Sequence, residues 1–124
     1  MNENVTKKTT GKEVFVVVLV ILVALVTLSA KIYYSNKVAK EGALISELGN
    51  LRGAVRLYMA VNKTYPPDIK ALTKTHDFFG NQEPYIRGVK LDKDGYPVDS
   101  WGNRFQYYTK RGWIYSGSQK YSKW

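Results

Sequence analysis

The chain has 124 residues, and its 19 lysines and arginines outnumber its 10 acidic residues, giving a formal net charge of +9. It contains no cysteine, which excludes disulfide bonds and thiolate metal sites. One long stretch is apolar, so the polar remainder is large enough for a single small domain only. The positive charge favours contact with anionic lipid or nucleic acid without choosing between them, and a solvated basic surface is the plainer explanation.

An uncharged apolar run, VFVVVLVILVALVTLSA, occupies residues 14–30. A helix of about 20 such residues spans the hydrocarbon core of a bilayer. A cleaved secretory signal is the rival interpretation, but its apolar core is usually shorter than this run. We therefore predict a transmembrane helix over residues 13–31.

The residues that flank this run predict its orientation. The polar leader before it carries three lysines, Lys7, Lys8 and Lys12. Short basic flanks tend to stay in the cytoplasm, whereas aromatic residues such as Tyr33 and Tyr34 favour the membrane–water interface. We expect a cytoplasmic leader at residues 1–12 and an extracytoplasmic domain at residues 32–124.

No proline interrupts the chain from Val14 to Tyr65, which favours one helix that continues beyond the membrane to about residue 62. In its second half, apolar side chains recur at spacings of three and four: Leu44, Leu48, Leu51, Val55 and Tyr58. This spacing places them on one face of the helix. The second half is thus predicted to be amphipathic and to pack on a small domain.

The remainder of the chain predicts a small β-structure. Pro66 and Pro67 stop the helix, and Asp68 is positioned to cap a short helix at residues 69–72. Irregular structure with one short strand at Tyr85–Val89 is expected up to about residue 96. Aromatic and β-branched runs at residues 105–109 and 113–116, separated by Lys110-Arg111-Gly112, predict a β-hairpin. The expected fold class is α+β, with a long helix packed on a small antiparallel sheet.

Three features together resemble type IV pilin-like proteins, most closely the major pseudopilin of type II secretion systems. The first is the apolar helix that becomes amphipathic. The second is the segment LRGAVRLY at residues 51–58 followed by NKTYP at residues 62–66. The third is DSWGNRFQY at residues 99–107, similar to the Asp-Pro-Trp-Gly-Asn turn of that family.

This resemblance implies a structural subunit of a pseudopilus or pilus-like filament, anchored in a bacterial inner membrane and assembled through its N-terminal helix. The expected partners are copies of itself or other pilin-like subunits, an inner-membrane assembly platform and a prepilin peptidase. By the same resemblance, Glu13 would neutralise the N-terminal amine of a neighbouring subunit; a simple interfacial carboxylate beside Lys12 is the alternative. Lys8 and Thr9 stand where the family has glycine and phenylalanine, so cleavage near Lys8 or Gly11 and an unprocessed leader are both open.

The turn at Asp99, Trp101, Gly102 and Asn103 has a structural interpretation of its own. The Asp99 side chain can accept hydrogen bonds from its own turn, and Gly102 and Asn103 tolerate left-handed backbone. Trp101 supplies a large apolar surface. The turn is therefore expected to connect the sheet to the helix.

Several members of the family bind calcium near this turn. Asp92, Asp94 and Asp99 offer hard oxygen ligands for calcium, but solvated loop aspartates are the favoured interpretation because their spacing matches no standard calcium loop. No other cofactor is expected.

Catalytic patterns are not visible in the sequence. His76 is the single histidine, and there is no HExxH motif or glycine-rich phosphate loop. We therefore expect a protein that is not an enzyme.

Two rival functions stay open. A DNA-binding minor pilin is suggested by basic residues among C-terminal aromatic ones, namely Lys110, Arg111, Lys120 and Lys123. Nucleic acid is nevertheless the less favoured partner, because basic and aromatic tails bind it only sometimes. The other rival is a membrane-anchored pilin-like module that never polymerises.

Overall fold

The computed structural model describes residues 10–124. The predicted leader therefore lies mostly outside the described residues, including Lys7, Lys8 and Thr9. The chain divides into two compact units, with the boundary between Val38 and Ala39.

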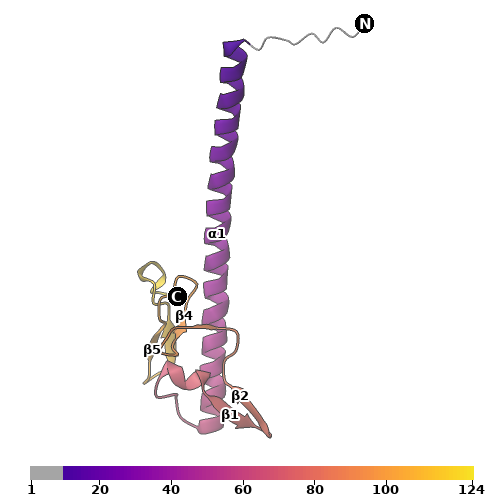
Figure 1. The fold of residues 1–124 in the computed structure, drawn as a ribbon. Coiled ribbons are helices and arrows are strands. Elements are labelled where there is room, and N and C mark those ends of the chain that lie inside the picture. Colours follow the sequence, from indigo (N-terminus) through magenta and orange to yellow (C-terminus); the bar gives the residue numbers. More distant parts are fainter. Residues whose placement is uncertain (1–9) are drawn as a thin grey trace. The chain divides into compact units, whose positions relative to one another are not determined.

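One helix, α1, extends over Gly11–Asn62, a length of 52 residues (Figure 1). It ends where Lys63 adopts a positive φ of 61° and donates its backbone N–H to the Met59 carbonyl over 2.8 Å. A left-handed residue directly after the last helical turn is a common helix stop. The predicted end near residue 62 is confirmed, and the helix stops ahead of Pro66 and Pro67.

The second half of α1 contributes the hydrophobic core of the second unit. Leu44 and Leu51 are fully buried, while Leu48 and Val55 are 2% and 3% exposed. These side chains, with Ala54, belong to one cluster with residues from later in the chain, namely Ile69, Leu72, Tyr85, Ile86, Phe105, Ile114 and Tyr121. Burying a leucine or valine side chain stabilises a fold by about 1.5–3 kcal/mol. The predicted apolar face is confirmed.

A short 3-10 helix, η1, follows at Ile69–Thr73 and matches the predicted helix at residues 69–72. Asp68 precedes it with an extended backbone, but its side chain makes no capping hydrogen bond. The Asp68 backbone carbonyl instead accepts a bond of 3.0 Å from the Ala71 N–H. The element was predicted correctly, and the proposed side-chain cap was wrong.

The irregular segment predicted between residues 73 and 96 is wrong in detail. Strands β1 (Thr75–Phe78) and β2 (Asn81–Pro84) form an antiparallel hairpin in which Phe78 pairs with Asn81. The intervening Phe79 and Gly80 have φ values of 53° and 87°. Positive φ at both positions is the turn geometry that suits the twist of two-residue hairpins. The hairpin was not predicted because its turn contains a phenylalanine and its strands are poor in β-branched residues.

The predicted strand at Tyr85–Val89 is also wrong. Tyr85 and Ile86 are buried in the core cluster, but this segment lies outside the strands. Ile86 donates its N–H to the Leu72 carbonyl over 3.2 Å, so the segment is tied to η1 instead of to a sheet. Its apolar residues are explained by this burial.

Two further hairpins complete the second unit. Strands β3 (Lys90–Leu91) and β4 (Pro97–Val98) pair antiparallel, as do β5 (Gln106–Tyr108) and β6 (Trp113–Tyr115). The β5–β6 hairpin is the predicted one. The described chain thus has three two-stranded sheets in place of the single sheet expected. The α+β layout is confirmed.

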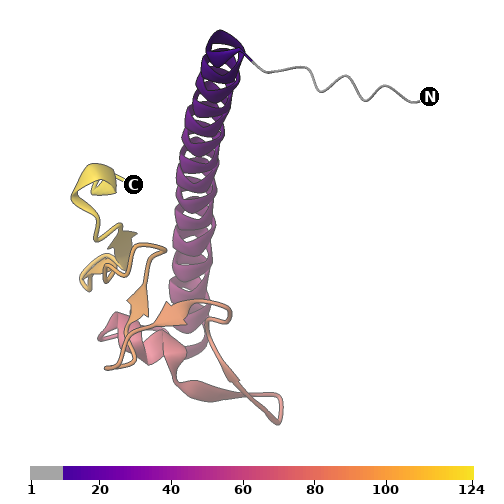
Figure 2. The same ribbon diagram turned by 45° about the horizontal axis from the view of Figure 1, so that its top comes forward.

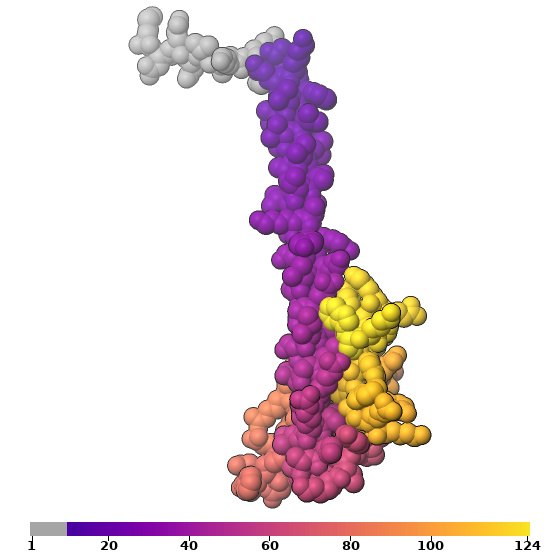
Figure 3. Space-filling model, turned by 180° about the vertical axis from the view of Figure 1, so that it is seen from behind, coloured from indigo at the N-terminus to yellow at the C-terminus, as the bar shows by residue number. Residues whose placement is uncertain are grey.

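Within the second unit, the β1–β2 hairpin and the C-terminal elements flank α1 from different sides (Figure 2, Figure 3). A last 3-10 helix, η2 (Gln119–Tyr121), lies against the middle of the chain's helix, where the Tyr121 hydroxyl donates to Glu41. Arg52 of α1 donates two hydrogen bonds to the Ile114 carbonyl of β6, over 3.0 and 3.3 Å. These contacts connect β6 and η2 to α1.

Candidate functional site

The first half of α1 exposes apolar side chains on every side. An 18-residue window within the helix has a mean hydropathy of 2.8, and none of it is buried. The two hydroxyl groups within the apolar run at residues 14–30 are satisfied inside the helix: Thr27 Oγ1 donates to the Val23 and Ala24 carbonyls and Ser29 Oγ to the Val26 carbonyl. A helix with internally satisfied polar groups and an apolar surface is compatible with a bilayer. The helix is long and apolar enough to cross a membrane.

Glu13 lies in the first turn of α1, where it takes part in a reciprocal contact with Thr10. Its carboxylate oxygen Oε2 accepts the Thr10 N–H over 3.4 Å, and the Glu13 N–H donates to the Thr10 carbonyl over 2.8 Å. A threonine followed three residues later by a glutamate is a capping-box sequence, and the negative charge also suits the positive end of the helix dipole. Glu13 therefore has a local function in starting the helix.

The Asp99 turn is built around a carboxylate that is completely buried. Asp99 Oδ1 accepts the N–H groups of Trp101 and Asn103 over 2.9 and 2.8 Å, and Oδ2 accepts the Asn103 side-chain amide. Gly102 has a φ of 86°. Trp101 is 37% exposed and stacks on Tyr121 at a ring distance of 5.4 Å. The turn thus connects the β4 end to the C-terminal residues.

Asp92 and Asp94 are bound to Arg104, whose guanidinium donates to one carboxylate oxygen of each. Desolvation opposes ionisation of Asp92, but hydrogen bonds from the Tyr96 N–H and from Arg104 outweigh it and lower the pKa of Asp92. The structure therefore pairs two of the three suggested calcium ligands with an arginine, while Asp99 bonds within its own turn. Residues 10–124 contain no group of three or more acidic or histidine side chains placed to hold a metal ion.

Glu47 is a second acidic group near the Asp99 turn. Its Oε1 accepts the Ser100 hydroxyl over 3.3 Å, whereas its buried Oε2 has no hydrogen-bond partner among the described residues. Burial is the main reason that the pKa of Glu47 is raised, and the neighbouring Asp99 charge adds to the effect. A buried acceptor without a donor costs stability, so this carboxylate is held by the packing around it.

The four basic residues suggested for nucleic-acid contact belong to different elements. Lys110 and Arg111 lie in the β5–β6 turn, Lys120 lies in η2, and Lys123 is exposed near the C-terminus. Lys120 pairs with Glu41 at 3.5 Å. Arg111 stands over the Trp113 ring, 4.9 Å from its centre. Of the four, Arg111 lines the surface hollow described next.

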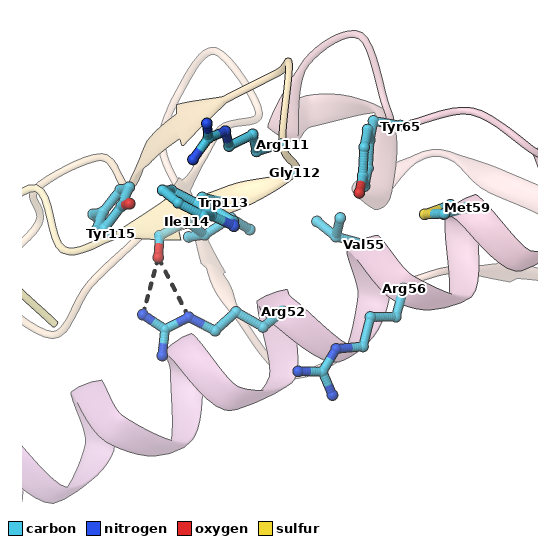
Figure 4. Close-up of a pocket in the computed structure, with 10 residues that line it drawn as sticks. All are labelled: Arg52, Val55, Arg56, Met59, Tyr65, Arg111, Gly112, Trp113, Ile114 and Tyr115. Carbon is cyan, nitrogen blue, oxygen red and sulfur yellow. Dashed lines mark hydrogen bonds between the residues drawn. The ribbon is translucent and has the colours of Figure 1, made fainter.

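This hollow lies between α1 and the β5–β6 hairpin and has a volume of about 430 Å³ (Figure 4). We define the arginine groove by six of its lining residues, Arg52, Arg56, Tyr65, Arg111, Trp113 and Tyr115. Figure 4 shows Arg52 and Arg56 on the helix and Arg111 above the Trp113 ring on the hairpin. None of the lining residues is acidic.

Gly112 is required for the walls of the groove to approach each other. It has a φ of 63°, and a Cβ at this position would lie 2.6 Å from the Tyr65 ring and 3.0 Å from Val55. Sequence reasoning identified Arg111 and Gly112 but missed Arg52, Arg56 and Tyr65 as surface partners. The signal available was that both arginines lie away from the apolar face of the helix, and it did not indicate which element they would meet.

Comparisons of the chain with protein-family models, with curated proteins and with solved structures give no match.

Proposed function

We propose that this protein is a structural subunit of a type II secretion pseudopilus or a type IV pilus-like filament, anchored in a bacterial inner membrane. Its N-terminus would be cytoplasmic and its small domain extracytoplasmic. The observation that carries the proposal is a single helix of 52 residues with two different surfaces. One half is apolar all round, and the other half buries one face in an α+β unit.

Two environments would keep the apolar half of α1 out of water. Its side chains, such as Leu22 and Val26 at 54% and 67% exposure, avoid water equally well in lipid or among the helices of other copies. A subunit that moves from the bilayer into a helical bundle keeps this surface covered throughout. The function proposed is therefore assembly, with no reaction assigned to the chain.

Crosslinking tests the filament directly, because the natural chain has no cysteine. A variant carrying Val16→Cys and Val26→Cys, treated in membranes with a bismaleimide, is expected to give a ladder of multimers. The matched control carries Phe79→Cys and Lys93→Cys, two exposed positions in turns of the second unit. A variant that stays monomeric at every crosslinker concentration would support the non-polymerising anchored module instead.

Glu13 offers a test that separates charge from capping. Glutamine at the fourth position of a capping box keeps an oxygen that can accept the Thr10 N–H, but it has no charge. If the Glu13 charge pairs with a neighbouring subunit, Glu13→Gln abolishes the ladder while Glu83→Gln, on β2, leaves it intact. An unchanged ladder in Glu13→Gln, with loss in Glu13→Leu, would restrict Glu13 to its cap.

The mass and N-terminal sequence of the protein from membranes with a prepilin peptidase test processing. Removal of the leader near Lys8 or Gly11, with a methylated new amine, is the result expected of a filament subunit. An intact Met1 would indicate an unprocessed, anchored relative.

A further inference from the structure

The arginine groove carries a positive charge that the described chain does not neutralise. The Arg56 guanidinium makes no hydrogen bond or ion pair within residues 10–124, and the Arg111 guanidinium lies over the Trp113 ring without an acidic partner in the same described residues. Arg52 donates Nε and Nη2 to the Ile114 carbonyl, which is neutral. Elsewhere in the second unit, arginines find acids: Arg87 pairs with Glu83, and Arg104 with Asp92 and Asp94. Three guanidinium groups at one hollow without an acid favour an anionic ligand.

The groove also offers aromatic surface. Tyr65 and Trp113 are 39% and 48% exposed although both belong to the walls of the hollow. Arg111 lies over one part of the Trp113 ring, so a guanidinium and an indole stand together (Figure 4). Exposed rings beside arginines can stack planar groups while the cations hold phosphates. This combination favours a ligand that is both anionic and aromatic.

A second hollow lies at the β5–β6 hairpin. It shares Arg111, Trp113 and Tyr115 with the first and adds Tyr107, Tyr108 and Gln106. Its lining also contains no acidic residue. Two hollows that share Arg111 and together present several aromatic rings suit a linear polymer better than a single small molecule.

We propose that the arginine groove is a binding site for single-stranded nucleic acid. Phosphates would contact Arg52, Arg56 and Arg111, and bases would stack on Trp113 and Tyr65. A second copy of the chain would have to offer acidic side chains to the groove, yet Glu83, Asp92 and Asp94 are already paired with arginines within the second unit. An acidic peptide would satisfy the arginines but would leave the ring faces without a planar partner.

The test uses the full-length protein in a non-ionic detergent and a fluorescein-labelled dT12 oligonucleotide, with binding followed by anisotropy. Three phosphate contacts to a single strand predict a slope of log K against log salt of about −2. Raising the salt from 50 to 200 mM should therefore weaken binding by about 20-fold. A salt-independent affinity would overturn the proposal.

Matched variants locate the site. Arg56→Gln and Arg111→Gln should each weaken binding at low salt several-fold and reduce the salt slope by about 0.7. Arg87→Gln removes the same charge from an arginine outside the groove and should leave the affinity nearly unchanged. Equal losses in all three variants would mean that net charge alone is responsible, and the site would be rejected.

Two further comparisons test the base contacts. Trp113→Leu should weaken binding by about 10-fold, while Trp124→Leu, outside both hollows, should not. An abasic 12-mer and a 12-residue polyglutamate should bind far more weakly than dT12. Equal binding of the abasic strand or of polyglutamate would show that the groove selects charge without bases and would contradict the proposal.

Discussion

Gly117 lies where two backbone segments approach each other too closely for any side chain. It follows β6, and a Cβ at this position would lie 1.8 Å from the Arg104 backbone carbonyl oxygen. The closest neighbour is backbone, so a side-chain rotation cannot relieve the clash. The absence of a Cβ therefore permits the segment after β6 to lie directly against the segment before β5.

We predict that Gly117→Ala destabilises the second unit by about 2 kcal/mol or more, because the backbone must move apart. Unfolding of the full-length protein in detergent, followed by tryptophan fluorescence, measures the loss. The control is Gly42→Ala on α1, where nothing lies within 4 Å of the added Cβ. That change should stabilise the helix by up to about 1 kcal/mol. A fully stable Gly117→Ala variant would contradict the close approach.

At the scale of elements, strand β5 is connected to the segment that leaves α1. The Tyr107 hydroxyl donates to the Pro66 carbonyl over 2.8 Å. Burial, together with Tyr65, Tyr58 and Asp68 nearby, raises the pKa of Tyr107 to about 12. The neutral phenol is thus the form that the fold requires.

Tyr107→Phe should cost about 1 kcal/mol, the usual net value of one hydrogen bond. Because the raised pKa makes the folded state hold the phenol proton more tightly, wild-type stability is complete below pH 10 and falls as the pH rises from 10 to about 12. Denaturant midpoints across this range measure the fall, and Tyr107→Phe should reduce its steepness.

Tyr108→Phe is the matched control for this prediction. Its ring is 47% exposed, and its hydroxyl makes no hydrogen bond within the described residues. Its unfolding midpoint should equal that of the wild type. If the stability of Tyr107→Phe fell between pH 10 and 12 as steeply as that of the wild type, the fall would have to come from other titrating groups.

At the scale of the whole molecule, the two halves of α1 should respond differently to the same substitution. Leu48 is 2% exposed and belongs to the core of the second unit, whereas Leu22 is 54% exposed in the first. Leucine-to-alanine changes in cores cost about 2–5 kcal/mol through lost burial and the cavity left behind.

Leu48→Ala should therefore lower the unfolding free energy of the second unit by about 2–5 kcal/mol. Leu22→Ala should leave that free energy unchanged and act only on membrane retention or crosslinking. Unfolding curves and membrane fractionation of both variants test this division. Equal destabilisation by the two changes would contradict the separation into two units.

The long helix, its end near Asn62 and its apolar face at Leu44, Leu48, Leu51 and Val55 could all be predicted from the sequence. These features depend on local periodicity, on the absence of proline and on a run of apolar residues, and all three can be read along the chain. The β5–β6 hairpin was predictable for the same reason, since two aromatic strands flank a turn with glycine.

The partners of the polar residues, in contrast, are visible only in the folded chain. Arg52 and Arg56 line the same hollow as Arg111 and Trp113 although more than 50 positions separate them in the chain, and Arg104 pairs with both Asp92 and Asp94. The β1–β2 hairpin was not predicted because β2 consists of Asn, Gln, Glu and Pro, and because Phe79 adopts a positive φ that few side chains favour. Such contacts arise from packing between distant segments, and local residue patterns contain no information on which distant segment a side chain will meet.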